Sequence, residues 1–87
     1  MFEAIGEAMI RFYFNVVAAA SRILDEEGRE LADLDAARAE AIQDARALMS
    51  EAILSGKDIS DRSVEICDEA GRTVLVVPFS DAINRFD

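Results

Sequence analysis

The longest regular pattern in the sequence lies at residues 33–56, DLDAARAEAIQDARALMSEAILSG. Apolar residues recur there at steps of three and four, which is the period of one face of an α-helix. They form a single stripe with alanines in its middle: Leu34, Ala37, Ala41, Ala45, Leu48 and Ala52. Asp33 is a suitable N-cap, and Gly56 favours the left-handed conformation that ends a helix. The pattern predicts a helix of about six turns, and its alanines allow close approach to whatever it covers.

A strong strand signal precedes this helix. Residues 10–17, IRFYFNVV, are rich in aromatic and β-branched side chains, as is typical of β-strands. Alternation places Phe12 and Phe14 on one face of this strand, and that face is predicted to join the core. Tyr13 and Val17 fall on the opposite face.

Three further strand-like runs flank the helix. Residues 22–31, RILDEEGREL, predict a second, weaker strand around their glycine. After the helix, residues 63–79, SVEICDEAGRTVLVVPF, contain two β-rich runs separated by a glycine turn, which is the pattern of a β-hairpin. Gly71 is well placed for the left-handed position of the hairpin loop. Pro78 cannot donate a ladder hydrogen bond, so it marks the end or the edge of the last strand.

The order strand, strand, helix, strand, strand predicts an α+β fold. We expect an antiparallel sheet of three to four strands with the one long helix packed on one face. A chain of 87 residues suits a single domain, which we place at residues 9–87. Residues 1–8 are expected to be a short N-terminal extension.

A single helix covers only one face of such a sheet. The other face is expected to carry more apolar side chains than a solvated surface needs, because the last strand is apolar at nearly every position. Uncovered apolar patches of this kind commonly mark interfaces. We therefore predict an interface with a second copy or with a protein partner at Tyr13, Val17, Thr73, Leu75 and Val77.

Two five-residue segments nearly repeat each other: DEEGR at residues 25–29 and DEAGR at residues 68–72. A calcium loop of the EF-hand type needs oxygen ligands at both ends of twelve residues, with glycine at the sixth. When Gly28 or Gly71 is set at the sixth position, both ends fall on apolar residues, so both frames fail. The shared residues instead indicate turns, in which an Asp binds its own backbone and a Gly takes a positive φ.

The charge of the chain narrows the classes of partner. Eighteen acidic and nine basic residues give a net charge of −9. This charge disfavours binding to phosphate backbones and to anionic membrane surfaces. A basic protein would be attracted, chiefly through faster association. No apolar run approaches the roughly 20 residues needed to span a bilayer. We expect a cytoplasmic protein with no nucleic-acid or membrane partner.

The side chains that most often carry catalysis are scarce. The sequence has no histidine and a single cysteine, Cys67. The serines therefore lack the usual activating base, and no cysteine cluster can bind zinc. The four glycines are scattered singly, so no phosphate-binding glycine loop exists. We predict no catalytic residues, no cofactor, no metal site and no enzymatic activity.

Three segments together resemble a known family: IRFYFNV, LDEEGRELADLDAARAEAIQDARALMSEAI and SVEICDEAGRTVLVVPFSDAI. Their shared features are an aromatic first strand, D-x-x-G-x-E-L, an A-R-x-E-A helix start and a closing V-P-F-x-D-A. They resemble small bacterial proteins classed as a domain of unknown function, which are abundant in soil and plant-associated bacteria. Members of that family often carry a histidine where this chain has Asn15. The resemblance implies no activity.

A looser similarity runs to the N-terminal domain of HicB-type antitoxins, which also has a β-rich start and an alanine-rich helix after a turn. That domain neutralises a small basic RNA-cleaving toxin, and the acidic charge of this chain suits such a partner. Our leading expectation is a non-enzymatic protein-interaction or self-associating domain. The alternative is an antitoxin-like acidic neutraliser of a small basic nuclease.

Overall fold

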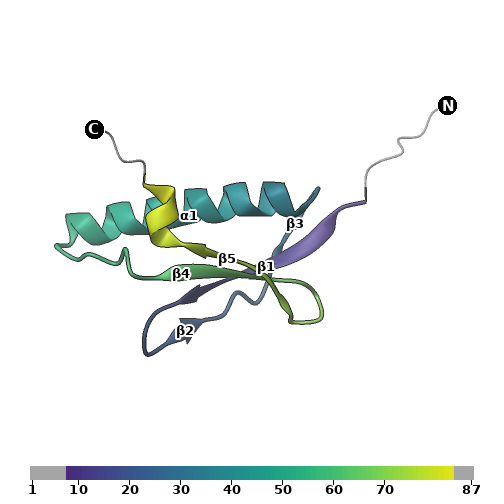
Figure 1. Cartoon of the computed structure of the whole chain (residues 1–87), viewed down its shortest axis with the longest axis horizontal. Coiled ribbons are helices and arrows are strands. Elements are labelled where there is room, and N and C mark those ends of the chain that lie inside the picture. Colours follow the sequence, from purple (N-terminus) through teal and green to yellow (C-terminus); the bar gives the residue numbers. More distant parts are fainter. Residues whose placement is uncertain (1–7, 84–87) are drawn as a thin grey trace.

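The computed structural model describes residues 8–83 of the chain. Within this range the elements follow one another as β1 (Ile10–Val17), β2 (Arg22–Ile23), β3 (Arg29–Leu31), α1 (Leu34–Leu54), β4 (Ser63–Cys67), β5 (Thr73–Pro78) and a 3-10 turn, η1 (Phe79–Ala82) (Figure 1). The predicted α+β fold is confirmed. Most of the predicted N-terminal extension, residues 1–7, lies outside the described residues.

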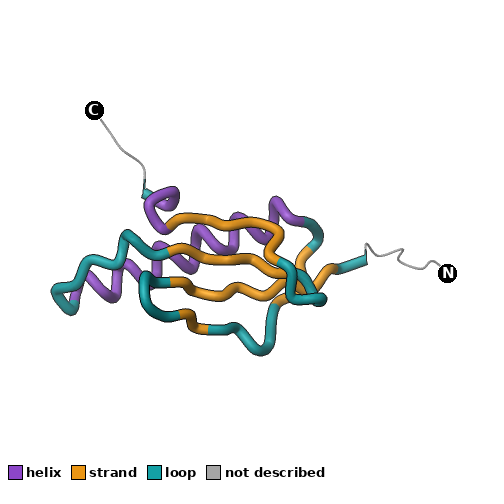
Figure 2. The backbone as a smooth tube through the Cα atoms, turned by 60° about the horizontal axis from the view of Figure 1, so that its bottom comes forward, coloured by secondary structure: helices purple, strands orange, loops and turns teal. Residues whose placement is uncertain are grey.

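The strands form one antiparallel sheet, and α1 crosses one of its faces (Figure 1). β1 lies between β4 on one side and the two short strands β2 and β3 on the other. β5 pairs with β4 and forms the far edge of the sheet (Figure 2). The sequence predicted one weak strand over residues 22–31, but the structure has two short strands there that pair with opposite ends of β1. The observed order is therefore β-β-β-α-β-β.

Helix α1 begins and ends where the sequence predicted. Asp33 is the N-cap, and its Oδ1 accepts a hydrogen bond from the N–H of Ala36 at 2.8 Å. Asp35 adds a favourable negative charge to the first turn. Ser55 is the C-cap, and the next residue, Gly56, has a φ of +81°. The predicted helix end at glycine is confirmed.

The core lies between α1 and the face of the sheet that α1 covers. The buried row of the helix follows a strict four-residue step: Ala37, Ala41, Ala45 and Met49. The sheet and η1 oppose it with larger side chains: Phe12, Phe14, Val64, Ile66, Val77 and Phe79. Leu34 and Leu48, which the sequence placed on the same stripe, are each 37% exposed. The small alanines thus face the sheet, and they leave room for the phenylalanines and branched residues opposite.

One arginine connects β3 to the helix. The guanidinium of Arg29 lies over the ring of Phe14, with its carbon 4.4 Å from the ring centroid. The same group forms ion pairs with Glu40 and Asp44 of α1. A cation–π contact of this partly exposed kind contributes about 0.5–1 kcal/mol, and each half-exposed ion pair adds about 1 kcal/mol at most. Arg29 therefore holds the short strand β3 against both β1 and α1.

Replacing Ala41 by Leu is expected to lower the free energy of unfolding by about 1–3 kcal/mol, because Ala41 is fully buried against the sheet and the added atoms have no space. The matched control is Ala39→Leu, on the exposed side of the same helix, which should change this free energy by less than about 0.5 kcal/mol. Urea unfolding followed by circular dichroism measures both variants. Equal losses at the two positions would contradict the packing described above.

Candidate functional site

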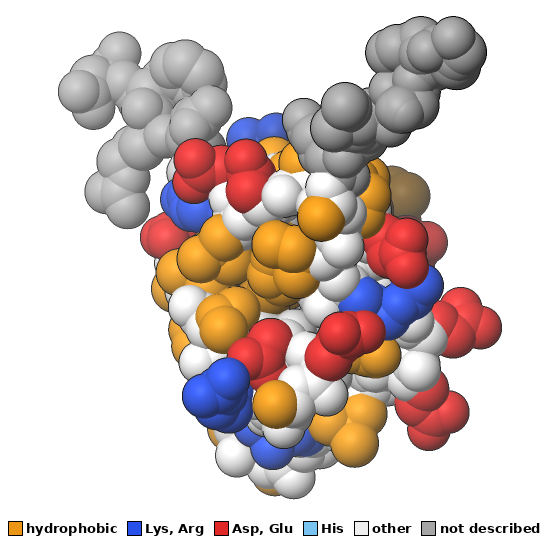
Figure 3. All heavy atoms as spheres, turned by 90° about the vertical axis from the view of Figure 1, so that its right-hand side faces the viewer, with side chains coloured by type: hydrophobic (Ala, Val, Ile, Leu, Met, Phe, Trp, Pro, Cys, Tyr) orange, Lys and Arg blue, Asp and Glu red, His pale blue; other side chains and the backbone are white. Residues whose placement is uncertain are grey.

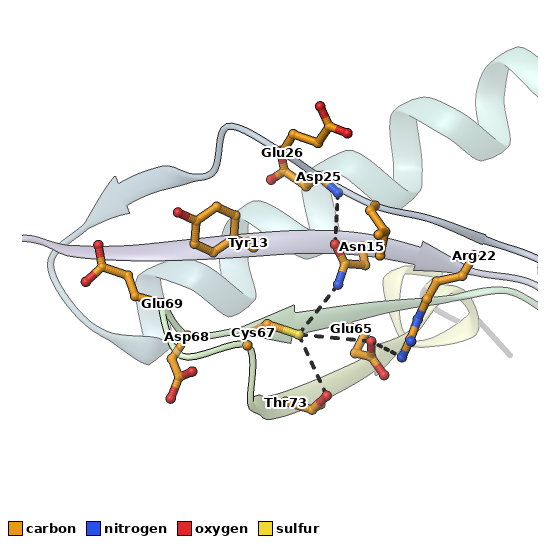
Figure 4. A pocket seen from close by; sticks show the side chains of 12 residues that line it. Tyr13, Asn15, Arg22, Asp25, Glu26, Glu65, Cys67, Asp68, Glu69 and Thr73 are labelled. Carbon is orange, nitrogen blue, oxygen red and sulfur yellow. Dashed lines mark hydrogen bonds and ion pairs between the residues drawn. The ribbon is translucent and has the colours of Figure 1, made fainter.

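The face of the sheet turned away from α1 has no covering element within residues 8–83 (Figure 1). We call this surface the open face and define it by the residues that alternate with the core along the strands, together with those of the adjoining loop: Tyr13, Asn15, Val17, Arg22, Leu24, Glu65, Cys67, Thr73 and Val76. A shallow depression of about 390 Å³ lies on it and is open to solvent (Figure 4). It is the candidate site.

Strand register places the central residues of the open face side by side. Tyr13 of β1 lies opposite Cys67 of β4, and Asn15 lies opposite Glu65. Glu65 in turn lies opposite Val76 of β5. Because residues directly opposite each other in an antiparallel sheet share a face, Asn15, Glu65 and Val76 form one row across three strands.

A chain of polar contacts crosses the floor of the depression (Figure 4). Asn15 is only 7% exposed, so its amide must be paired inside the protein. Its Oδ1 accepts a hydrogen bond from the N–H of Asp25 at 2.9 Å, and its Nδ2 donates to Sγ of Cys67 at 3.5 Å. Sγ of Cys67 also lies 3.7 Å from Oγ1 of Thr73. These contacts connect the loop after β2 to the start of β5.

The side chain of Asp25 occupies the gap between β2 and β3 along β1. Its Oδ2 accepts a hydrogen bond from the N–H of Phe14 at 3.0 Å. Its Oδ1 accepts from the N–H groups of Glu27 and Gly28 at 3.2 and 3.1 Å. The carboxylate therefore bonds the edge of β1 at the point where neither short strand reaches it.

These hydrogen bonds control the ionisation of Asp25. Burial by itself raises the pKa of the Asp25 carboxyl, because it disfavours the charged form. The N–H groups of Phe14, Gly28 and Glu27 outweigh that effect, and the nearby charge of Arg29 adds to them. The net pKa lies below the ordinary value of 3.8. Asp25 is therefore fully ionised at neutral pH.

Both predicted turns are confirmed. Oδ1 of Asp68 accepts hydrogen bonds from the backbone N–H groups two and four positions later, each at 2.9 Å, much as Asp25 binds its own loop. Gly28 and Gly71 have φ values of +72° and +84°. A Cβ at Gly28 would lie 2.8 Å from the carbonyl oxygen of Phe12, whereas Gly71 faces open space. The first turn is thus packed directly on β1, and only glycine fits there.

The border of the depression is acidic. It is lined by five carboxylates and one arginine, Arg22, which forms an ion pair with Glu65. We call the carboxylates the acidic rim: Asp25, Glu26, Glu65, Asp68 and Glu69. At the end of the molecule that carries β3 and the β4–β5 turn, acidic side chains stand among exposed hydrophobic ones (Figure 3). The surface thus combines negative charge with apolar area.

The open face combines a buried thiol, carboxylates and apolar side chains. Cys67 is 6% exposed, beneath Asn15 and Thr73, and the chain has no histidine to act as its base. Among residues 8–83 no three His, Cys, Asp or Glu side chains form a group that could hold a metal ion. The face has apolar side chains and paired polar groups, and the carboxylates form its polar border, as the rim of a protein interface does.

The structure separates the predicted interface residues into two groups. Tyr13 and Thr73 line the depression, and Val17 lies half-buried on the same face. Val77, by contrast, is 1% exposed and belongs to the core, and Leu75 packs against that core. The prediction that these two residues lie on the open face is wrong.

The reason for this error lies in the pairing of β5 with β4. Val77 lies opposite Val64, and the following pair joins Val76 to Glu65. Because β5 is apolar on both faces, its sequence does not show which side chains face the helix. The sequence of β4 does show this, because its polar and apolar residues alternate. Pairing with β4 assigns Val76, which is 51% exposed, to the open face. Leu24, 60% exposed, was also missed, because it lies in a loop that only the structure places beside β1.

A family model described as Domain of unknown function (DUF6894) matches residues 11–80. The chain belongs to this family. The DUF6894 match runs from the second residue of β1 into η1 and so includes the whole of α1, β4 and β5. Comparison with curated proteins and with solved structures gives no match. Within the part of the chain that the structure describes, no helix is long and apolar enough to cross a membrane.

An Asp25→Asn variant is expected to lower the free energy of unfolding by about 1–3 kcal/mol at pH 7, because an amide cannot accept hydrogen bonds at both positions of the carboxylate. The folded-state pKa of Asp25 is depressed, so the contribution of the carboxylate is complete above the unfolded-state pKa, near 3.8. It is lost as the pH falls through the lower folded-state pKa.

Unfolding of both proteins across this acid range measures the effect. The stabilities of the natural chain and Asp25→Asn should converge as the pH falls below 3.8. Glu26→Gln, one residue along the same loop and exposed, is the control and should show neither the loss nor the convergence. A stability difference that stays constant with pH would refute the role given to the Asp25 carboxylate.

Proposed function

We propose that this DUF6894 domain is a non-enzymatic protein-interaction module of the cytoplasm, which self-associates or binds a protein partner through the exposed part of its sheet. The observation that carries the proposal is strand β5. It is an edge strand of six residues, TVLVVP, without a charged side chain. Val74 and Val76 on it are 40% and 51% exposed. A free, apolar edge strand is a ready template for pairing with another chain.

The opposite edge of the sheet carries the protection that β5 lacks. β2 and β3 have two and three residues, which is too short for an outside strand to extend the sheet. Between these strands, the carboxylate of Asp25 accepts the hydrogen bond of the Phe14 N–H, so that donor cannot pair with an outside strand. Arg11 adds a hydrogen bond from Nη1 to the carbonyl oxygen of Glu27 at 2.6 Å. Among residues 8–83, one edge is thus blocked and no strand pairs with the outer side of β5, and this asymmetry supports a binding role for β5.

The open face supports the same proposal. Val76 and Leu24 expose apolar area on either side of a polar centre in which both the Oδ1 and the Nδ2 of Asn15 have a hydrogen-bond partner. A partner covering this face would therefore bury apolar side chains without leaving the Asn15 amide buried and lacking hydrogen bonds. Uncovered patches of this kind are typical of protein interaction sites.

The acidic rim favours a second candidate, an antitoxin-like neutraliser of a small basic nuclease. Five carboxylates and one arginine around the depression would attract a cationic protein surface, in keeping with the net charge of −9. In this case the partner would cover the rim and the depression together, and long-range charge would speed association.

The proposed function is tested by capturing partners from native cells with the tagged chain and two variants. Leu24→Lys/Val76→Lys places charge at both apolar ends of the open face and should lose the retained protein, whether a second copy or another partner. Gln43→Lys, on the exposed side of α1, is the control and should retain it. Circular dichroism verifies that both variants fold. Retention that is unchanged in the double variant would contradict binding through this surface.

The second candidate makes a separate prediction about salt. If a captured partner is a basic protein bound at the acidic rim, raising the salt from about 0.05 M to about 0.5 M should weaken binding by at least about tenfold, because exposed charges are screened. Glu26→Gln/Glu69→Gln should reduce that salt dependence. Affinity that is insensitive to salt would exclude the neutraliser.

A further inference from the structure

The ladder between β4 and β5 fixes which backbone groups of β5 face outward. Ser63 lies directly opposite Pro78, and the N–H of Phe79 donates to the carbonyl oxygen of Arg62 at 2.8 Å. Residues of an antiparallel strand alternate between bonding to one side and to the other. Since Phe79 bonds toward β4, Pro78 and Val76 direct their backbone polar groups away from it, toward solvent.

Val76 is the centre of this free edge. Its N–H and C=O both point outward, whereas Pro78 has no N–H and offers only its C=O. The single register shift in the β4–β5 ladder lies between Ile66 and Cys67, beside the start of β5. The strand is therefore regular from Leu75 to Pro78, which is the part that another strand would join.

We propose that β5 pairs in antiparallel fashion with β5 of a second copy of this chain, about a two-fold axis at Val76. The inference rests on the proposed function and names its partner. Each Val76 exchanges both of its outward hydrogen bonds with Val76 of the other copy. Leu75 of each copy then lies opposite Val77 of the other on the helix side, and Pro78 comes beside the exposed Val74 at the irregular start of β5. The two sheets become one, with both helices on the same face.

Charge favours this arrangement over other pairings. Arg72 precedes β5 with its side chain 79% exposed, and the exposed Asp81 follows the strand in η1. Antiparallel pairing about Val76 brings the Arg72 end of each β5, where Arg72 pairs with Asp68 of its own chain, to the η1 end of the other copy, which carries Asp81. A parallel pairing would instead place Arg72 beside Arg72. The strand itself is uncharged, and Glu65, opposite Val76 in the ladder, is already paired with Arg22. No like charges therefore meet in the new ladder.

Sedimentation of the purified chain tests the proposal. An interface built on one strand per copy is small, so we expect a dimerisation constant on the order of micromolar and a monomer–dimer transition between about 1 µM and about 500 µM chain. Val76→Lys should weaken dimerisation at least about tenfold, because two ammonium groups then face each other at the axis. Gln43→Lys also adds one positive charge, on the exposed side of α1 away from β5, and should dimerise like the natural chain.

The results separate this inference from the proposed function. A natural chain that stays monomeric throughout the range overturns the dimer, and partner capture then decides the proposed function by itself. A dimer that survives Val76→Lys, or that Gln43→Lys weakens as much as Val76→Lys does, also overturns the pairing through β5, although self-association would stand.

Cross-linking tests the register without relying on a destabilising charge. The Cα atoms of two residues paired across the axis lie about 5.5 Å apart, within the span of a disulfide. Val76→Cys should form a covalent dimer when oxidised glutathione is added at concentrations where the chain dimerises. The natural chain, whose Cys67 is buried, and Leu24→Cys are the controls and should form little. A Val76→Cys chain that dimerises but does not cross-link more than Leu24→Cys would overturn the proposed register.

Discussion

The carboxylate of Asp25 determines how one edge of this sheet ends. β1 is eight residues long, and its outer side is paired by β2 at one end and β3 at the other. Between them the N–H of Phe14 is bonded by a side chain instead of a strand. The same residue binds its own loop and donates to Asn15, so the loop, the edge of β1 and the floor of the open face are positioned together.

The two edges of the sheet consequently differ in kind. The edge at β2 and β3 is occupied by short strands, side-chain hydrogen bonds and ion pairs. At the other edge β5 is uncharged, and no strand in the described part of the chain pairs with its outer side. A small domain buries a limited core, and added burial through association is a natural source of stability. The free backbone groups of Val76 and the exposed valines beside them supply the place where that burial would occur. The proposed interaction module follows from this asymmetry.

Much of the fold could be predicted from the sequence, because the information is local. Asp33, the alanine row and Gly56 determine α1, and the turn after Asp68 determines the hairpin. The split of residues 22–31 into two strands depends on a contact between Asp25 and Phe14, 11 positions apart, which no local pattern shows. Within the candidate site, Tyr13 and Thr73 could be placed correctly. Leu75 and Val77 could not, because β5 is apolar on both faces and only its register with β4 orients it.

Amide hydrogen exchange of individual residues tests the central claim most directly, since it reports on both edges in one sample. The account predicts that the N–H of Phe14 is protected at every protein concentration, because Asp25 accepts its hydrogen bond. The N–H of Val76 should exchange rapidly in dilute protein and become protected as the concentration rises. Exchange of Phe14 as fast as that of Val76 in dilute protein would contradict the blocked edge. Fast exchange of Val76 at all concentrations would contradict pairing through the free one.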